Sequence, residues 1–371
     1  MKVLIVSSGL PSTRYPLEGV FAYDQAKALA SQDLDVTFFS IDLRSIRKIR
    51  RFGFDSFVRD NVKCYTFSVP LGPIGYGILN RVGCIVGNIL YKRVYKKDIR
   101  PDIIHTHFAA SYGAFLSTKY DIPLVITEHS SEMNRIDLPQ LVIDRALKSY
   151  GKANAVISVS SLLAESLYKK TGITSRVIHN IIDTGLFSAL PKVSHPSFTF
   201  VTTALLSERK RIHQLIPAVM QCPETVRLII IGDGPERPRI EQLIKENQLA
   251  GRVKMKGLLS REETAKIYAE SDCFVLPSAL ETFGVVYVEA MAAGLPVIAT
   301  RCGGPEDFVT EDNGLLIDVD NQNQLINAMH YMIDNVESYS EERIKEFANS
   351  NFSPNVIANQ IIELYKKIVK Q

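Results

Sequence analysis

One pattern, repeated twice along the chain, constrains the fold more than any other feature of the sequence. Short apolar runs alternate with longer amphipathic stretches. In the first half we expect strands at residues 3–7, 36–40, 103–107, 124–127 and 155–159, with a helix at 21–31. Residues 74–91 are also mostly apolar, but Asn80, Arg81 and Asn88 interrupt them, which favours a helix over a core. Strands separated by helices form a parallel sheet covered on both faces.

The pattern stops near residues 180–198 and then restarts. In the second half we expect strands at 198–203, 227–231, 253–256 and 273–276, and helices at 212–220, 237–246 and 261–269. A last helix should follow Pro354. We therefore predict two Rossmann-like α/β domains facing a central cleft, over residues 1–183 and 184–352. Residues 353–371 should form a helix that packs back on the first domain. In such sheets, ligands bind outside the carboxyl ends of the strands.

Composition excludes several classes of protein. The formal net charge is only +3, so the totals do not predict a nucleic-acid binder. The five cysteines are odd in number and lack metal-ligand or redox spacing, which is typical of reduced thiols in a cytosolic protein. No apolar run reaches the ~20 residues that span a bilayer, and the first run is too short for a signal peptide. We expect a cytoplasmic protein, with peripheral attachment to the inner face of the membrane as a further hypothesis.

The segment richest in chemistry is residues 277–299, PSALETFGVVYVEAMAAGLPVIA. It follows an expected strand and opens a helix for which Thr282 is the expected N-cap. The amides of Phe283, Gly284 and Val285 would then form an anion site at the positive end of the helix dipole. Glu289 lies two turns further in an otherwise apolar helix. It should be buried and needs a hydrogen-bonded partner, for which the diol of a ribose is suitable.

This segment resembles the E-x7-E signature of family 4 glycosyltransferases, which have the GT-B fold. Residues 229–235, 253–257, 303–306 and 126–129 also resemble family stretches, in family order. The resemblance implies a nucleotide-sugar donor bound mainly by residues 184–352 and an acceptor bound by residues 1–183. It implies that Glu289 holds the ribose hydroxyls and that Glu281 contacts the transferred sugar. It also implies retention of configuration, no metal ion and no cofactor, with polysaccharide or cell-envelope glycan assembly as the setting.

Several further positions match the family. Lys210 matches a family lysine near the diphosphate, whereas Leu205 stands where the family has an arginine. We expect Arg209 or Arg211 to compensate. The remaining residues expected at the site are the catalytic His129 near the transferred sugar, and Gly19, Asn180, Gly232 and Gly257 on the donor side.

Other polar residues are expected to be structural. His105 and His107 alternate along their strand, so we expect them on opposite faces of the sheet. Asp318 and Asp320 form a D-x-D sequence, but two acidic residues before a helix need no metal to explain them.

Two basic segments of the first half predict contact with an anionic membrane surface and a lipid-linked or membrane-proximal glycan acceptor. The alternative is that these segments form a basic surface that faces solvent and contacts no membrane. The segments contain Arg44, Arg47, Lys48, Arg50 and Arg51 in residues 44–51, and Lys92, Arg93, Lys96 and Lys97 in residues 92–97.

The sequence leaves the mechanism and two other functions open. The leaving diphosphate can accept the proton of the acceptor hydroxyl on the same face, or two displacements can occur in succession. A nucleotide-sugar epimerase and a non-catalytic nucleotide-sugar-binding protein are the alternatives, and Leu205 favours the second. The turn Gly232-Asp233-Gly234 lacks the full glycine fingerprint of a dinucleotide oxidoreductase.

Overall fold

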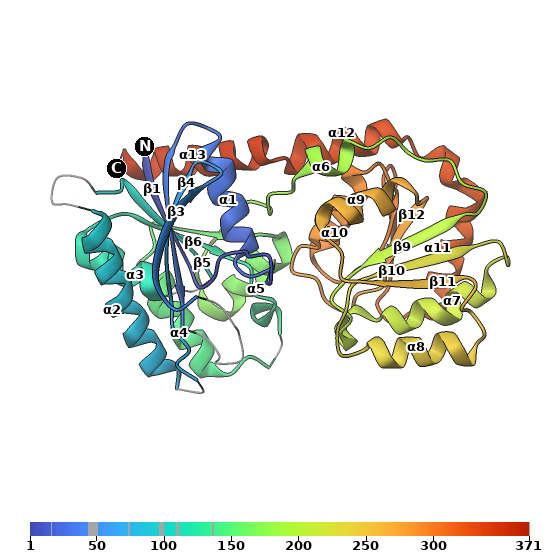
Figure 1. Cartoon of the computed structure of the whole chain (residues 1–371), viewed down its shortest axis with the longest axis horizontal. Coiled ribbons are helices and arrows are strands. Elements are labelled where there is room, and N and C mark those ends of the chain that lie inside the picture. The colour runs from blue at the N-terminus through green and yellow to red at the C-terminus, as the bar shows by residue number, and fades with distance from the viewer. Residues whose placement is uncertain are drawn as a thin grey trace. The chain divides into compact units, whose positions relative to one another are not determined.

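The computed structural model describes residues 1–15, 17–43, 51–72, 75–95, 100–108, 111–135 and 137–370. The chain divides into two compact units, each with its own sheet (Figure 1). The first unit comprises Met1–Ile181 and Pro354–Gln371, and the second comprises Ile182–Ser353. Every helix in the described ranges falls short of the length and apolar character that a membrane-crossing helix requires.

The sheet of the first unit has eight strands in its described part, in the order β3-β4-β2-β1-β5-β6-β7-β8. All pair in parallel except β3, which runs antiparallel to β4 at the edge. This hairpin was not predicted from the sequence; its turn is at Asp60 and Asn61, which have positive φ values of 52° and 60°, as in a tight hairpin turn. The strands are β1 (Lys2–Ser7), β2 (Asp35–Asp42), β3 (Gly53–Arg59), β4 (Val62–Ser68), β5 (Ile103–His107), β6 (Leu124–Glu128), β7 (Ala155–Ser158) and β8 (Arg176–Val177).

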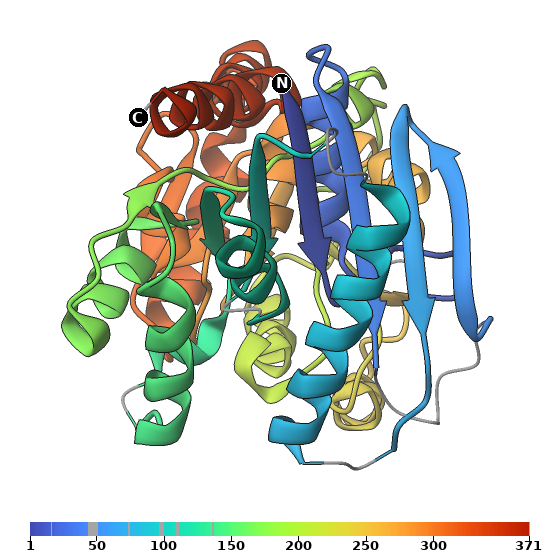
Figure 2. The same ribbon diagram turned by 90° about the vertical axis from the view of Figure 1, so that its left-hand side faces the viewer.

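Helices cover both faces of this sheet. α1 (Val20–Ala30) packs beside α13 (Pro354–Val369) on one face. The connections through α2 (Tyr76–Val94), α3 (Ser111–Tyr120), α4 (Gln140–Tyr150) and α5 (Ser161–Thr171) run the other way along the sheet. Right-handed crossovers therefore place these four on the opposite face. In Figure 2, α2 (cyan) lies in front of the strands.

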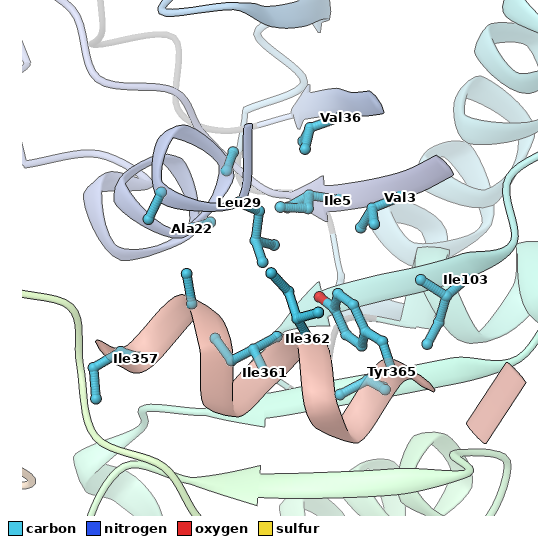
Figure 3. Packing of buried hydrophobic residues seen from close by; sticks show 14 of the residues in the cluster. Val3, Ile5, Ala22, Leu29, Val36, Ile103, Ile357, Ile361, Ile362 and Tyr365 are labelled. Atoms are coloured by element: carbon cyan, nitrogen blue, oxygen red, sulfur yellow. The ribbon is translucent and has the colours of Figure 1, made fainter. Parts of the chain in front are cut away.

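The core under α13 explains why the C-terminal segment belongs to the first unit. Ile361, Ile362 and Tyr365 of α13 point toward Ile5 of β1 and Leu29 of α1 (Figure 3). The buried residues of α13 recur every three to four positions, which is the spacing of one helical face. The units meet in sequence at Ile181/Ile182 and at Ser353/Pro354, beside the expected boundaries at 183/184 and 352/353.

The second unit has a sheet of six strands in its described residues, all parallel, in the order β11-β10-β9-β12-β13-β14. After β9 the chain adds β10 and β11 on one side of β9, and it then crosses to add β12 on the other side. The carboxyl ends of β9 and β12 therefore form a switch point, where open sheets bind ligands. The strands are β9 (Thr199–Thr203), β10 (Arg227–Ile231), β11 (Val253–Gly257), β12 (Cys273–Leu276), β13 (Val297–Thr300) and β14 (Gly314–Ile317).

The helices of the second unit follow the expected alternation. α8 and α9 have the expected bounds, whereas the helix expected at 212–220 is divided into a 3-10 turn (Ile212–Gln214) and α7. The fold class predicted from the sequence is confirmed: two sheets of mainly parallel strands, each in its own unit. The helices are α6 (Thr184–Ser188), α7 (Leu215–Gln221), α8 (Arg237–Glu246), α9 (Arg261–Ala269), α10 (Val285–Ala292), α11 (Gln322–Asn335) and α12 (Glu341–Phe352).

Candidate functional site

An ion pair lies at the switch point of the second sheet. Lys210 Nζ is 2.5 Å from Glu281 Oε1, and the two side chains are only 13% and 9% exposed. Ser278 Oγ donates a hydrogen bond to the same carboxylate oxygen at 2.8 Å. The amide of Ala279 donates to the carbonyl of Arg209 at 2.8 Å, which ties the loop after β12 to the loop after β9. The structure thus brings together two residues that are 71 positions apart in the sequence.

The backbone of Glu281 is fixed as firmly as its side chain. Its amide donates to the carbonyl of Cys302, and its carbonyl accepts from the amide of Gly304, both at 3.0 Å. Gly304 permits this close approach, since a Cβ there would lie 2.2 Å from the carbonyl oxygen of Phe283. The loop after β13 therefore holds Glu281 in place without using its carboxylate.

Helix α10 begins directly after this pair. The expectation that Thr282 is its N-cap is wrong, because Gly284 occupies that position with a left-handed φ of 97°. Glycine adopts this conformation readily, and a Cβ at Gly284 would lie 2.7 Å from the ring of Tyr287. The first amides of a helix have no intrahelical acceptor. Phe283, Gly284 and Val285 therefore stand at the positive end of α10, next to Glu281.

Glu289 is buried in α10, as expected, with 8% of its surface exposed. Its Oε1 is 3.8 Å from Nε of Arg261, at the start of α9. Burial, and next the charge of Glu289, raise the pKa of the Tyr268 hydroxyl. That hydroxyl donates to Thr203 Oγ1 at 2.9 Å, so Glu289 lies near the carboxyl end of β9.

Gly232 and Gly257, which are expected to approach the donor, lie at the carboxyl ends of β10 and β11. The amide of Gly232 donates to the carbonyl of Gly257 at 2.7 Å. A Cβ at Gly232 would lie 1.8 Å from the carbonyl oxygen of Ala204, so no larger residue fits there. Leu205, next in the chain, is 58% exposed.

Arg211 is directed away from the ion pair. Its Nε is 2.9 Å from Asp320 Oδ1, and this hydrogen bond lowers the pKa of Asp320. Asp318 accepts a hydrogen bond from Gln324 Nε2 at 2.9 Å. Both acidic residues of the D-x-D sequence thus have partners within the protein. Nowhere in the described ranges do three or more His, Cys, Asp or Glu side chains gather as metal ligands would.

In the first unit, His129 follows the carboxyl end of β6 and lies among other rings. It stacks on Phe21 of α1 at 5.2 Å between centroids, and Phe108 lies 5.3 Å away. This desolvation lowers the pKa of His129 to about 3, although the nearby Asn180 side chain opposes the shift. The imidazole is therefore neutral at physiological pH. Its Nδ1 makes no hydrogen bond of normal geometry with any described residue.

The expectation for His105 and His107 is wrong. Residues two apart on a strand share one face, and the two rings stack at 5.1 Å. His107 Nδ1 is also 2.8 Å from His129 Nε2. Whichever ring donates, one buried imidazole hydrogen lacks a partner of normal geometry among the described residues: on Nε2 of His107 if His129 donates, and on Nδ1 of His129 if His107 donates. The Asn180 side chain lies near His129 and acts to raise its pKa, as an acceptor of a ring hydrogen would. We therefore infer that His107 donates and that His129 carries its hydrogen on Nδ1.

Gly19 and Asn180 lie close to His129. Gly19 caps α1 with a left-handed φ of 67°, and a Cβ there would lie 2.2 Å from the carbonyl oxygen of Gly9. A cavity of about 480 Å³ is lined by Gly19, Phe21 and Phe108, among others. Asn180 is 7% exposed and lines a small pocket with Phe21 and His129. The first unit thus gathers three expected residues at the carboxyl edge of its sheet.

Four contributors to these sites were not predicted. His107 holds His129, Ser278 holds Glu281, Arg261 faces Glu289, and Phe21 stacks on His129. His107 could have been found from the two-residue period of its strand. Ser278 lies three residues before Glu281 in the same loop, a spacing at which its hydroxyl reaches the carboxylate. The contacts of Arg261 and Phe21 join separate elements, and no local spacing indicates them.

Two family profiles match the chain. "Glycosyl transferases group 1" matches residues 191–350, and "Glycosyltransferase Family 4" matches residues 19–186. A putative teichuronic acid biosynthesis glycosyltransferase of Bacillus subtilis, TuaC, is 27% identical over 342 residues, which are 85% of each chain.

Two solved structures share the fold over nearly the whole chain. Sucrose-phosphate synthase from Thermosynechococcus elongatus has a TM-score of 0.79 at 21% identity, covering 100% of this chain and 99% of that one. Anabaena HepE in complex with UDP and glucose has a TM-score of 0.76 at 23% identity, covering 99% of each chain.

Proposed function

Because the chain belongs to glycosyltransferase family 4 and has the GT-B fold, we propose that it is a retaining hexosyltransferase. It would transfer the sugar of a nucleotide-diphosphate sugar to a glycan or lipid-linked acceptor without a metal ion. The observation that carries the proposal is the pair Lys210–Glu281 beside the N-terminus of α10. A cation, a carboxylate and helix amides then meet at the switch point of one sheet.

Each group of the second unit has a chemical task in this proposal. As the glycosidic bond breaks, negative charge develops on the diphosphate, which Lys210 and the first amides of α10 stabilise. Glu281 accepts hydrogen bonds from hydroxyls of the transferred sugar. Glu289, with Arg261 as its protein partner, accepts hydrogen bonds from the ribose. Gly232, Gly257 and the exposed Arg209 border the donor.

Donor binding should reorganise the ion pair. In this structure Lys210 donates to the carboxylate of Glu281. In the proposed complex Lys210 turns to the diphosphate, and the sugar hydroxyls replace it as donors to Glu281. Ser278 keeps its hydrogen bond to that carboxylate. The pair therefore holds both groups in place, with their charges balanced, before the donor arrives.

The transfer balances without an external base. The bond from the anomeric carbon to the diphosphate oxygen breaks, and the acceptor oxygen forms a bond to that carbon on the same face. The acceptor proton passes to the leaving diphosphate oxygen. Double displacement through a covalent intermediate is the competing route. Both routes retain configuration, so the product alone does not separate them.

His129 enters this chemistry as a neutral hydrogen-bonding group. With a pKa of about 3 it carries no charge at pH 7. With its hydrogen on Nδ1, it can donate to a hydroxyl of the transferred sugar but cannot act there as a base. Gly19 and Asn180 border the same part of the first unit.

For the acceptor we propose a membrane-proximal glycan or lipid-linked sugar. Of the basic segments, residues 44–50 and 96–97 lie outside the described residues. The adjoining surface is basic and apolar, because Phe52 is 55% exposed, Phe54 is 40% exposed and Arg93 Cζ lies 5.3 Å above the Phe54 ring. Ile85 of α2 is 59% exposed. Such surfaces bind anionic lipid interfaces.

Flotation with vesicles tests this part alone. The protein should float with vesicles containing phosphatidylglycerol and stay unbound with neutral ones. A variant with Phe52→Ser and Phe54→Ser should float less. Equal recovery from neutral and anionic vesicles, or none from either, would refute the membrane proposal and leave the transferase proposal standing.

The test of the transferase proposal is a donor screen with chelator present. UDP-, GDP- and ADP-sugars are incubated with mixed glycan acceptors, and NMR gives the anomeric configuration of the product. We expect transfer with retention in EDTA. Inversion, or dependence on a divalent cation, would overturn it. Family membership argues against both the epimerase and the non-catalytic alternative, and an epimerised sugar formed without acceptor would revive the first.

A further inference from the structure

A second cavity of the first unit has no task in the proposed reaction. It has a volume of about 590 Å³ and is lined by residues of α2, α3 and α4. These helices cover one face of the first sheet (Figure 1). Four of its lining residues are cations, and none of the described lining residues is acidic. The cations are Lys119, Arg145, Lys148 and Lys152.

Ordinary helix stability explains only part of this arrangement. Lys119 and Lys148 lie in the last turns of α3 and α4, where cations favour the helix dipole. Arg145 lies in the middle of α4, and Lys152 follows its end, so neither is placed by that rule. The helix dipole also does not explain why cations from two different helices line the same cavity. The charges of Lys119, Lys148 and Lys152 around one cavity repel each other, and an anion within it relieves the repulsion.

The rest of the lining matches the surface of a sugar. The ring of Phe115 lines the cavity, and Lys119 Nζ lies 5.5 Å from its centroid. An aromatic face packs against the C–H face of a sugar ring. Thr118 also lines the cavity, and its hydroxyl, which donates to the carbonyl of Ala114, keeps its oxygen as an acceptor for a sugar hydroxyl. The volume lies within the range of ~300–1,000 Å³ of small-molecule sites.

We propose that this cavity binds an anionic saccharide, a sugar that carries a phosphate or a carboxylate. The cations neutralise the acidic group, and Phe115 with the neighbouring polar side chains holds the ring. The ligand has two possible sources: a soluble sugar phosphate, or an acidic residue of a glycan chain. Both present the same chemistry to the cavity.

The topology separates this cavity from the residues around His129. Helices α3 and α4 run from the carboxyl edge of the sheet to the amino edges of β6 and β7. Thr118, Lys119 and Lys148 lie in the last turns of these helices. Gly77 and Asn80 of the lining lie in the first turns of α2, so the separation is one of faces: the ring of His129 stacks on Phe21 of α1, whereas α2, α3 and α4 cover the opposite face of the sheet. The proposal therefore does not rest on the role of His129 or on the donor site.

Calorimetric titration of the full chain tests the proposal. The probes are glucose 6-phosphate and an oligosaccharide of uronic acids, with glucose and inorganic phosphate as partial ligands. We expect one of the anionic saccharides to bind at least 10-fold more tightly than either partial ligand. Affinity should fall as salt rises from 50 to 300 mM, because salt screens partly exposed charges.

Variants locate the binding. Lys148→Ala and Lys152→Glu should each weaken it, and together by at least ~10-fold, whereas Lys169→Glu, on the exposed face of α5, should not. Glu289→Ala should leave it unchanged. Thermal unfolding checks that each variant is folded. Which probe binds identifies the source of the ligand.

Three results would overturn the proposal. Neither anionic saccharide binds; or binding survives the double substitution; or Glu289→Ala abolishes it, which would place the ligand in the donor site. Binding of inorganic phosphate as tight as that of the saccharides would refute the role of the sugar ring. None of these outcomes bears on transfer activity, so failure here is distinct from failure of the proposed function.

Discussion

Replacing Glu281 by Gln should destabilise the second unit, because Lys210 would keep its charge in a poorly hydrated place without its counter-ion. The substitution preserves the shape of the side chain, and Ser278 can still donate to the amide oxygen of the Gln. The effect therefore isolates the charge of Glu281 from its packing and from one of its hydrogen bonds.

The size of the effect follows from the burial of the pair. Breaking a buried ion pair by removing one partner costs about 3–5 kcal/mol. Here the side chains are 13% and 9% exposed, so some hydration of Lys210 remains and we expect about 2–3 kcal/mol. For a unit of the size of Ile182–Ser353, 1 kcal/mol shifts Tm by about 2–4 °C. The unfolding transition of this unit should fall by roughly 5–10 °C.

A double-mutant cycle measured by calorimetry and urea unfolding separates the pair from its surroundings. Lys210→Met removes the second charge, so the double variant should be less destabilised than the two single effects added together, by about 2 kcal/mol. The exposed pair Arg237–Glu241 is the control, because solvent screens an exposed pair and Glu241→Gln should leave the Tm nearly unchanged. A fall in Tm below 2 °C in Glu281→Gln, or additive effects in the cycle, would refute the reasoning.

Three further predictions concern the two units. Leu205→Arg should tighten binding of the nucleoside diphosphate about 10-fold in calorimetry, since a charge-assisted hydrogen bond contributes about 1.5–3 kcal/mol; an unchanged affinity would show that this position does not reach the diphosphate. His107→Phe keeps the stacked ring but removes the hydrogen bond to His129, so ¹⁵N NMR of the His129 ring should show a mixture of tautomers in place of one; unchanged ¹⁵N shifts would exclude a role for His107 in setting the tautomer. Burial lowers the pKa of His105 to about 3 in the folded chain, against about 6.5 in the unfolded chain. Between pH 6.5 and pH 5 only the unfolded chain gains the proton, so the free energy of unfolding should fall by about 2 kcal/mol by pH 5. Urea titrations in which the wild type and His105→Gln lose equal stability between pH 7 and 5 would contradict this.

The alternation of apolar runs predicted the architecture because each run forms one strand of a parallel sheet. Strands such as 103–107 and 273–276 agree with β5 and β12 residue for residue. The hairpin β3–β4 escaped prediction because Gly53–Arg59 lies at a sheet edge and is largely exposed. Its apolar residues therefore do not form the short buried run that marked the other strands. Only the turn at Asp60 and Asn61 carries a local signal.

The site was less accessible to sequence reasoning. Glu289 was predicted to be buried because its helix offers no polar face, and it is. The pairing of Glu281 with Lys210 depends on how two loops far apart in sequence meet, and spacing contains no such information. The cap at Gly284 was misplaced because a side-chain cap at Thr282 follows the usual rule, whereas close packing with Tyr287 favours glycine at the true start of α10.

Nucleotide binding by calorimetry, in the presence of EDTA, tests the central claim most directly. The chain should bind one of UDP, GDP or ADP. Glu289→Ala should weaken that binding by about 10- to 100-fold, through loss of charge-assisted hydrogen bonds to the ribose. Glu224 precedes the amino end of β10, whereas the proposed site lies at the carboxyl ends of the strands. The control variant Glu224→Ala should therefore bind nucleotide as the wild type does. No binding of any nucleotide, or equal affinity in Glu289→Ala, would contradict a nucleotide-sugar site in the second unit.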